Sequence, residues 1–336
     1  MSDSLSTIYG LILDLAAIGS FTIKPFSIFI IIYYTPKHLR ITSYFILNEM
    51  IWNLAGNLLF TLGHPYPLLP AQCIRLDGII AQFISSETIR HIFFLLILVT
   101  AVNCNIGLLT TFQFRYMAIA WKDIRTRVHV AWGYVYCILL HVICTAIFCY
   151  LQYNMRTTVE EYSQLDHLEH TNNVFCFKPS GWEKRLLMWS FFFSMIGFAA
   201  TLLVFTLLCY AEFRKQEGQL EKKTLEMQRR VMRNLVIMTA VPVVLACFPL
   251  FMASLFIQFN EWPYAREVAA VSYMLVSNHG TVYSVLTLLL FQSYRRAAKT
   301  ILDKCSSVVL RVVLKRKSPV VMTTKVMTIG YSSRRI

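Results

Sequence analysis

The sequence predicts an all-α membrane protein, a bundle of seven transmembrane helices with an outside N-terminus and a cytoplasmic C-terminus. Of the 336 residues, 56% are hydrophobic and only 15% are charged, and the mean hydropathy is +0.53. A soluble protein of this length could not cover so much apolar surface. Aromatic residues make up 14% of the chain, which excludes a disordered chain.

Seven segments are long and apolar enough to cross a bilayer, since a spanning helix needs about 20 mainly apolar residues. We expect one membrane domain over residues 1–292 and a basic tail over 293–336, and the tail is predicted to begin with a short amphipathic helix. The predicted spans are 8–34, 41–63, 89–112, 128–151, 186–210, 235–259 and 268–291.

The basic residues predict the orientation of this bundle. Most of the 32 Lys and Arg residues lie in the tail and in the connections after the first, third and fifth spans. The acidic residues Glu160, Glu161, Asp166 and Glu169 lie in a connection on the other side. The positive-inside rule therefore places the tail in the cytoplasm and the N-terminus outside. These bases lie beside helix ends, where they contact anionic membrane lipid, so the net charge of +14 does not indicate nucleic-acid binding.

Enzyme and metal chemistry receive little support from the sequence. No Gly-x-Gly-Asp, His-Glu-x-x-His or serine-based catalytic motif falls within a span, so we predict neither an enzyme nor a cofactor. The run Asp166–His170 holds two histidines and two carboxylates, which are adequate zinc ligands. Because no rigid element holds their geometry, we favour a solvated acidic loop over a metal site.

Two ionisable residues stand out deep inside the predicted spans, where charge is costly and usually paired or functional. Lys24 in the first span and Glu49 in the second lie at similar depth on antiparallel neighbours. One interpretation is a structural ion pair between them. The alternatives are separate partners, with the lysine reaching toward the membrane surface, and a direct role with a ligand or a proton.

Further polar residues predict a network inside the bundle. Glu49, Asn53 and Asn57 recur every four residues and therefore share one helix face. We favour hydrogen bonds between helices for this face, with an internal ion or water site as the alternative. The other candidate members of the network are Asn103, Asn105, Asn278 and His279.

The position of the cysteines suggests one disulfide. Of the nine cysteines, only Cys73 and Cys176 fall in predicted outside connections, where disulfides form and persist. We expect them to pair and to shape the entrance to an outer pocket. Cys149, near the outer end of the fourth span, is the competing partner.

Several short motifs relate the chain to a known family. An Arg-Tyr pair closes the third of seven helices, and this resembles G-protein-coupled receptors, in which the arginine helps to hold and then release the coupling surface. The remaining motifs resemble those of nematode serpentine chemoreceptors, especially class H and its class I relatives. They are Thr35–Leu39, Trp52, Pro65–Pro70, Gln113–Tyr116, His279–Ser284 and Ser293–Arg295. Together they extend over nearly the whole chain in the order that the family shows.

The resemblance implies a chemosensory receptor at the plasma membrane of sensory neurons, with a small odorant or soluble chemical as ligand and a heterotrimeric G protein as partner. No oligomeric state is predicted. Gln113 and Phe114 depart from the family pattern, because neither provides an acidic neighbour for Arg115, and Ser293 replaces a proline. The runner-up functions are a ligand-gated cation channel of the insect odorant-receptor kind, whose N-terminus is inside, and a transporter, for which the expected internal repeat is missing.

The predicted mechanism rests on the sixth span, where Pro242 and Pro249 each remove a helix hydrogen bond and favour a kink. Movement of this span would expose a basic cleft to the G protein, although contact with lipid headgroups also explains each basic residue singly. The predicted coupling residues are Arg115, Tyr116, Arg229, Arg230 and Arg233.

The ligand pocket is predicted only by position, in an outer cavity among the third, fifth, sixth and seventh spans. Pockets for small molecules are mostly apolar, with a few polar groups. Ordinary packing, or the aromatic belt at the membrane surface, is the alternative explanation for each candidate. The candidates are Arg90, His91, Trp189, Gln258 and Tyr273.

Overall fold

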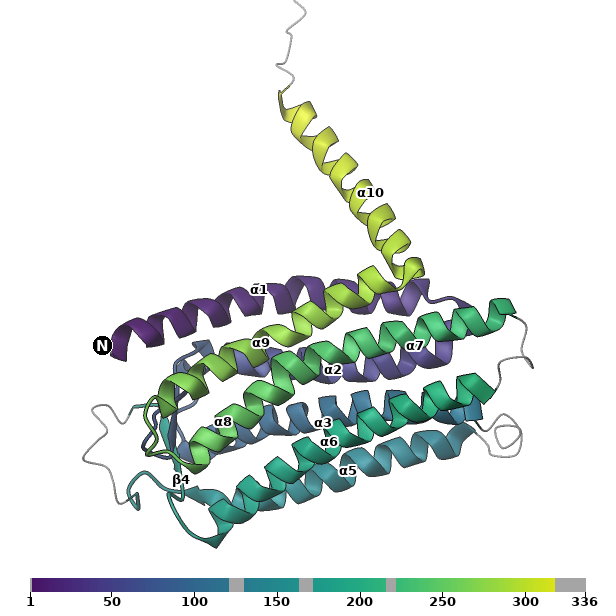
Figure 1. Cartoon of the computed structure of the whole chain (residues 1–336). Helices are drawn as coiled ribbons and strands as arrows, with labels where there is room; N and C mark the ends of the chain where they lie inside the picture. Colours follow the sequence, from purple (N-terminus) through teal and green to yellow (C-terminus); the bar gives the residue numbers. More distant parts are fainter. Residues whose placement is uncertain (1, 121–129, 163–171, 216–221, 318–336) are drawn as a thin grey trace, which may run out of the picture. The chain divides into compact units, whose positions relative to one another are not determined.

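The computed structural model describes residues 2–120, 130–162, 172–215 and 222–317, and its main feature is a bundle of long helices (Figure 1). The chain forms two compact units, Met1–Arg295 and Arg296–Ile336. The first contains the bundle and the second contains most of the last helix. The helices are α1 (Ser2–Tyr34), α2 (Arg40–Gly63), α3 (Glu87–Ala120), α5 (Val130–Met155), α6 (Trp182–Lys215), α7 (Lys222–Pro242), α8 (Phe248–Gln258), α9 (Ala265–Leu290) and α10 (Gln292–Lys317), with short 3-10 turns η1 (Lys37–Leu39) and η2 (Ile79–Gln82).

The helices α7 and α8 are two parts of one interrupted helix. A π-helical turn, η4 (Val243–Cys247), joins them, and the apolar stretch Leu225–Gln258 runs through all three elements. Pro242 ends α7 and Pro249 lies in the first turn of α8, and neither proline has an N–H to donate within the helix. The two prolines therefore lie on either side of the π-helical turn.

The described helices differ in how well they suit a bilayer. Five stretches are long and apolar enough to cross one, in α1, α3, α5, α6 and α7–α8, and α9 passes only together with the start of α10. The α2 helix is less apolar because Asn48, Glu49, Asn53 and Asn57 interrupt it. Since α2 packs on α1, α3 and α9, its buried polar residues have neighbouring helices as partners. With α2 and α9 included, the described residues contain seven helical segments of the bundle, and these lie side by side (Figure 1).

The outer surface of the bundle is apolar, as contact with lipid requires. On α5, for example, Trp132, Ile138 and Ile143 are more than half exposed. Large exposed apolar patches are rare on soluble proteins. In contrast, the interior holds buried polar residues such as Lys24 and Glu49, each 1% exposed. The predicted all-helical membrane bundle is confirmed in its architecture.

A small antiparallel sheet closes one end of the bundle, which we name the sheet end. Its strands are β1 (Pro65–Pro67), β2 (Cys73–Leu76), β4 (Val174–Phe177) and β3 (Arg156–Thr157), in that order across the sheet. The run of prolines that the family resemblance rested on therefore contributes β1. The opposite end, where α3 and α6 end and α7 begins, is named the distal end.

Candidate functional site

A cavity of about 150 Å³ lies in the bundle directly under the sheet. Six helices (α2, α3, α5, α6, α8 and α9) and three strands contribute to its wall, so it belongs to no single pair of helices. Aromatic and aliphatic side chains form most of that wall. They include Phe60, Phe94, Ile97, Leu98, Phe148, Met155, Phe177, Leu187, Met188, Phe191, Leu250, Ile257 and Val276.

Four polar side chains also line the cavity, and two of them are already hydrogen-bonded. Gln72 donates through Nε2 to the Ile257 carbonyl at 3.0 Å, and the Ser254 hydroxyl donates to the Leu250 carbonyl at 2.7 Å. Gln152 on α5 is 7% exposed and Tyr273 on α9 is 8% exposed. Neither of these two makes a side-chain hydrogen bond within the described part of the chain.

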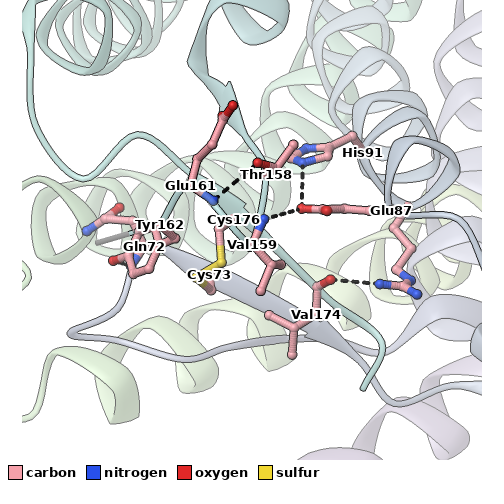
Figure 2. Close-up of a disulfide and its surroundings, with 11 residues drawn as sticks. Gln72, Cys73, Glu87, His91, Thr158, Val159, Glu161, Tyr162, Val174 and Cys176 are labelled. Carbon is pink, nitrogen blue, oxygen red and sulfur yellow. Dashed lines mark hydrogen bonds and ion pairs between the residues drawn. A yellow bond between two sulfur atoms is a disulfide. The ribbon is translucent and has the colours of Figure 1, made fainter. Parts of the chain in front are cut away.

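The roof of the cavity is held by a disulfide between Cys73 and Cys176 (Figure 2). The two cysteines face each other across β2 and β4, and Cys149 is free. The Tyr162 hydroxyl accepts a hydrogen bond from the Gln72 backbone N–H at 2.8 Å, and burial raises the pKa of this tyrosine above its ordinary value. Because Gln72 and Cys73 also line the cavity, the disulfide and this hydrogen bond fix part of its wall.

Of the five ligand-pocket residues predicted from the sequence, only Tyr273 lines this cavity. Arg90 supports the roof instead, since its guanidinium donates to the carbonyls of Val174 and Ser85 at 2.8 and 2.7 Å. Trp189 is 53% exposed and its ring packs against Phe192 and Phe193 on the same helix. Gln258 ends α8 and lies outside the lining.

His91 lies beside a second, polar hollow of about 250 Å³ at the sheet end. Its Nε2 is 3.9 Å from the Glu87 carboxylate, and its ring packs edge-on against Phe175 and Phe177. Glu87 accepts a hydrogen bond from the Val159 backbone N–H at 3.0 Å (Figure 2). These contacts tie the start of α3 to the loop beyond β3.

Below the cavity, three buried polar residues from different helices form a hydrogen-bonded chain. The Lys24 ammonium donates to Oδ1 of Asn53 at 2.5 Å, which leaves the Asn53 amide N–H to face Nε2 of His279 at 2.8 Å. Since an ammonium only donates, the amide orientation is fixed, and Nε2 of His279 must accept. Nδ1 then carries the proton and donates to the Val276 carbonyl at 2.5 Å. His279 is therefore neutral, with its proton on Nδ1.

Glu49 joins the same network without touching Lys24. No ion pair within 4.0 Å connects the two side chains among the described residues. Instead, Asn53 lies between them, since its amide also contacts Sγ of Cys104 at 3.8 Å, and Cys104 lies 3.5 Å from Oε1 of Glu49. Of the sequence interpretations, separate partners therefore describe the geometry better than a direct pair. Oε2 of Glu49 has no hydrogen-bond partner in this structure.

The helix α9 approaches this network closely because position 280 is a glycine. A Cβ added to Gly280 would overlap Oδ1 of Asn53 and lie 2.6 Å from the Lys24 ammonium. At Gly280 the network therefore leaves no room between α1, α2 and α9 for even a single methyl group. This explains the glycine in the His279–Ser284 motif by packing.

The other predicted network residues divide among different sites. Asn57 joins the centre, because its amide donates to the Ser277 carbonyl at 2.6 Å and to Ser20 at 3.4 Å. Asn103 instead faces α5, where it donates to Thr145 at 2.8 Å and contacts His141. Asn278 donates to the Met274 carbonyl of its own helix at 2.9 Å. Asn105 lines a chamber of about 60 Å³ between the cavity and the network.

The chamber lies against both the cavity under the sheet and the polar network around Lys24. Asn53 and His279 of the network form part of its wall, while five residues are shared with the wall of the larger cavity. Ala246 of the π-helical turn also lines it. The shared residues are Phe60, Ile97, Ala101, Leu250 and Val276. A molecule in the cavity would thus contact α8 close to the turn that joins it to α7.

At the distal end, α7 is fastened to two neighbours. The Arg115 guanidinium of α3 donates to the Gln228 carbonyl at 3.4 Å, and the Asn234 amide donates to the Leu290 carbonyl of α9 at 2.9 Å. Tyr116 packs near Phe205 of α6. Arg230 and Arg233 are exposed and Arg229 is partly buried. Sequence reasoning missed Asn234, whose only signal is an amide directly before the predicted span 235–259.

Metal binding finds no support in the described residues. Within them, no group of three or more His, Cys, Asp or Glu side chains is arranged to hold a metal ion. The run Asp166–His170 lies outside the described residues, so its interpretation as an acidic loop stays a prediction.

Comparison with known proteins identifies one family. The family described as serpentine type 7TM GPCR chemoreceptor Srh matches residues 4–304, which includes every helix of the bundle and the sheet. No curated protein matches the chain.

Proposed function

The chain belongs to the Srh family of serpentine seven-transmembrane chemoreceptors, and on this premise we propose that it binds a small molecule in the cavity under the sheet and signals to a heterotrimeric G protein from its distal end. The predicted class H resemblance and the predicted seven-helix membrane fold are thereby confirmed. The family is a receptor class and not an enzyme class.

The proposed orientation places the sheet end outside the cell, at the plasma membrane of sensory neurons. A disulfide between Cys73 and Cys176 fits the sheet end, because such bonds persist in oxidising compartments. The distal end carries the basic connections, and the positive-inside rule favours the cytoplasm for these. Both arguments point the same way but rest on different residues.

The single observation that carries the proposal is the position of the cavity. It opens beneath the sheet, is lined by helices from both halves of the chain, and shares Leu250 and Val276 with the chamber below. Small-molecule sites in helix bundles have this mostly apolar lining with few polar groups. A ligand here therefore contacts α8 and α9 together.

Signalling would follow from movement of α7 relative to α3 and α9. The hydrogen bonds from Arg115 to Gln228 and from Asn234 to Leu290 hold α7 in place, so both must break before α7 moves outward. The prolines at positions 242 and 249 weaken the connection between α7 and α8. A ligand shifts this equilibrium only by binding the two arrangements with different affinity. The exposed Arg230 and Arg233 would then contact the G protein.

The test combines topology with signalling. Both termini carry epitope tags, antibody access is measured in unpermeabilised cells, and ligand-evoked G-protein dissociation is recorded with a panel of volatile chemicals. Arg115→Ala is expected to abolish the response at normal surface expression. Arg40→Ala is the matched control, since Arg40 is an exposed arginine at the same end of the bundle. An exposed C-terminus, or a ligand-evoked current without G protein, would overturn the proposal.

A further inference from the structure

We infer that the cavity selects neutral, mainly hydrocarbon molecules that carry one hydrogen-bonding oxygen, and that Gln152 and Tyr273 form hydrogen bonds with that oxygen. This inference rests on the proposed function, because it takes the cavity to be the ligand site. It goes further by naming the class of ligand and the two residues that determine specificity.

The wall of the cavity disfavours charged ligands. Within the described residues, no Asp, Glu, Lys, Arg or His side chain lines the cavity. Two basic residues of the surrounding structure are already engaged: Lys24 below the cavity bonds Asn53, and Arg90 in the roof bonds two backbone carbonyls. An ammonium or a carboxylate entering the cavity would lose its hydration and find no opposite charge. Such a transfer costs far more than any gain in apolar contact.

Two polar side chains of the wall have no hydrogen-bond partner within the described residues. Gln152 and Tyr273 are more than nine-tenths buried, and buried polar side chains are normally hydrogen-bonded. Both line the cavity, and they come from α5 and α9. A ligand oxygen accepts from the tyrosine hydroxyl or from the glutamine amide, and a ligand hydroxyl can also donate to the amide oxygen. Either contact supplies the hydrogen bond that these groups lack.

The size of the cavity limits the ligand. A dry apolar cavity of about 150 Å³ is known to hold benzene, and the cavity under the sheet has about the same volume. Two of its lining rings, Phe60 and Tyr273, meet edge-on with centroids 5.8 Å apart. The geometry therefore favours molecules of about six to ten heavy atoms, by comparison with benzene.

A matched series of six-membered rings separates these features. The probes are methylcyclohexane, cyclohexanone, cyclohexanol, cyclohexylammonium and cyclohexanecarboxylate, which share one hydrocarbon body and differ in the polar group. Binding is measured as the shift in thermal unfolding of the purified full-length receptor in lipid nanodiscs, since a ligand that binds only the folded state raises that temperature. No G protein is present, so failure of coupling and failure of ligand selection are distinguishable.

Cyclohexanone and cyclohexanol are expected to bind more tightly than methylcyclohexane, and the two charged probes are expected not to bind. Tyr273→Phe and Gln152→Met should each weaken cyclohexanone binding by roughly three- to tenfold, as the loss of one hydrogen bond predicts. Neither substitution should weaken binding of methylcyclohexane. Tyr150→Phe is the matched control, because Tyr150 is an exposed residue on α5 that does not line the cavity.

Ala101→Leu tests whether the probes occupy this cavity. Ala101 lies on the wall shared with the chamber, so a larger side chain should weaken binding of all the neutral probes together. Charged probes that bind as tightly as cyclohexanone would overturn the inference. Cyclohexanone affinity that stays unchanged in both Tyr273→Phe and Gln152→Met would overturn it as well, whether or not the receptor couples to a G protein.

Discussion

The cavity under the sheet and the polar network around Lys24 are neighbours, but two buried polar side chains of the first lack hydrogen-bond partners among the residues that the structure describes, whereas those of the second are hydrogen-bonded to one another. In the cavity, Gln152 and Tyr273 keep their hydrogen-bonding capacity and about 150 Å³ of space stays open. In the network, Lys24, Asn53 and His279 bond one another, and no methyl group fits at Gly280. The cavity can therefore respond to a molecule, whereas the network only holds its helices together.

The largest effect should come from removing the positive charge of the network. Lys24→Met leaves Oδ1 of Asn53 without its donor and removes the positive charge that lies across Asn53 from the buried Glu49 carboxylate. An uncompensated buried charge costs up to about 3–5 kcal/mol. The fraction of receptor that stays folded after heating in detergent should fall strongly. Lys304→Met, at an exposed tail position, is the control. Lys24→Met combined with Glu49→Gln should recover much of the loss, and a single variant as stable as the control would show that the charges are not coupled.

Removing the disulfide should cause the next largest loss of stability, and it should also affect the cavity, because the disulfide holds the roof. Cys73→Ser opens a covalent loop with a sequence separation of 103 residues, and a cost of about 2–4 kcal/mol is typical for a disulfide. Cyclohexanone binding should weaken along with stability, since Cys73 lines the cavity. Cys149→Ser removes a free cysteine and should change neither. Equal behaviour of the two serine variants would argue against a structural disulfide.

A smaller loss of stability is expected from a substitution at Gly280, where the network leaves no space for a side chain. Gly280→Ala should cost about 1–3 kcal/mol through overpacking against Asn53. Gly197→Ala on α6 is the control, because a Cβ there meets no atom within 4 Å. That control should be neutral or slightly stabilising, since alanine favours helix more than glycine does. The measurement is thermal unfolding of both variants in nanodiscs. If Gly280→Ala were as stable as Gly197→Ala, the tight packing at Gly280 would be refuted.

The smallest effect should appear outside both regions. Trp189 is 53% exposed on the surface of the bundle, so Trp189→Leu should change stability by less than about 0.5 kcal/mol, as is usual for surface substitutions. The dissociation constant for cyclohexanone should also stay the same. If it changed as much as in Tyr273→Phe, the ligand would lie elsewhere than in the cavity described.

Sequence periodicity was sufficient for the bundle and for one face of the network. Glu49, Asn53 and Asn57 recur at four-residue spacing and are all buried on α2. Spacing alone does not say which helix that face meets, however. Asn103 and Asn278 were expected in the central network for this reason. In the structure, Asn103 faces Thr145 and His141 of α5, and Asn278 bonds a carbonyl of its own helix.

The disulfide that holds the roof was predicted from the sequence and is present, but the cavity and the strands of the roof were beyond sequence reasoning for a different reason. The cavity is lined by phenylalanine, leucine and isoleucine side chains that look like ordinary core residues in a sequence, so only Tyr273 among the expected pocket residues lines it. The strands are two to four residues long, too short for an alternating pattern to be recognised. They form because the disulfide and neighbouring loops bring distant segments together.

The bond between Cys73 and Cys176 also decides what happens when the chain is cut. A protease that cleaves once anywhere between these two positions leaves the receptor as one covalent molecule, with α1 and α2 still attached to α6, α7, α8 and α9 through the sulfur atoms. On a denaturing gel without reductant, such a nicked receptor migrates as a single species. Adding reductant separates it into two fragments, so the gel reports both the cut and the bond.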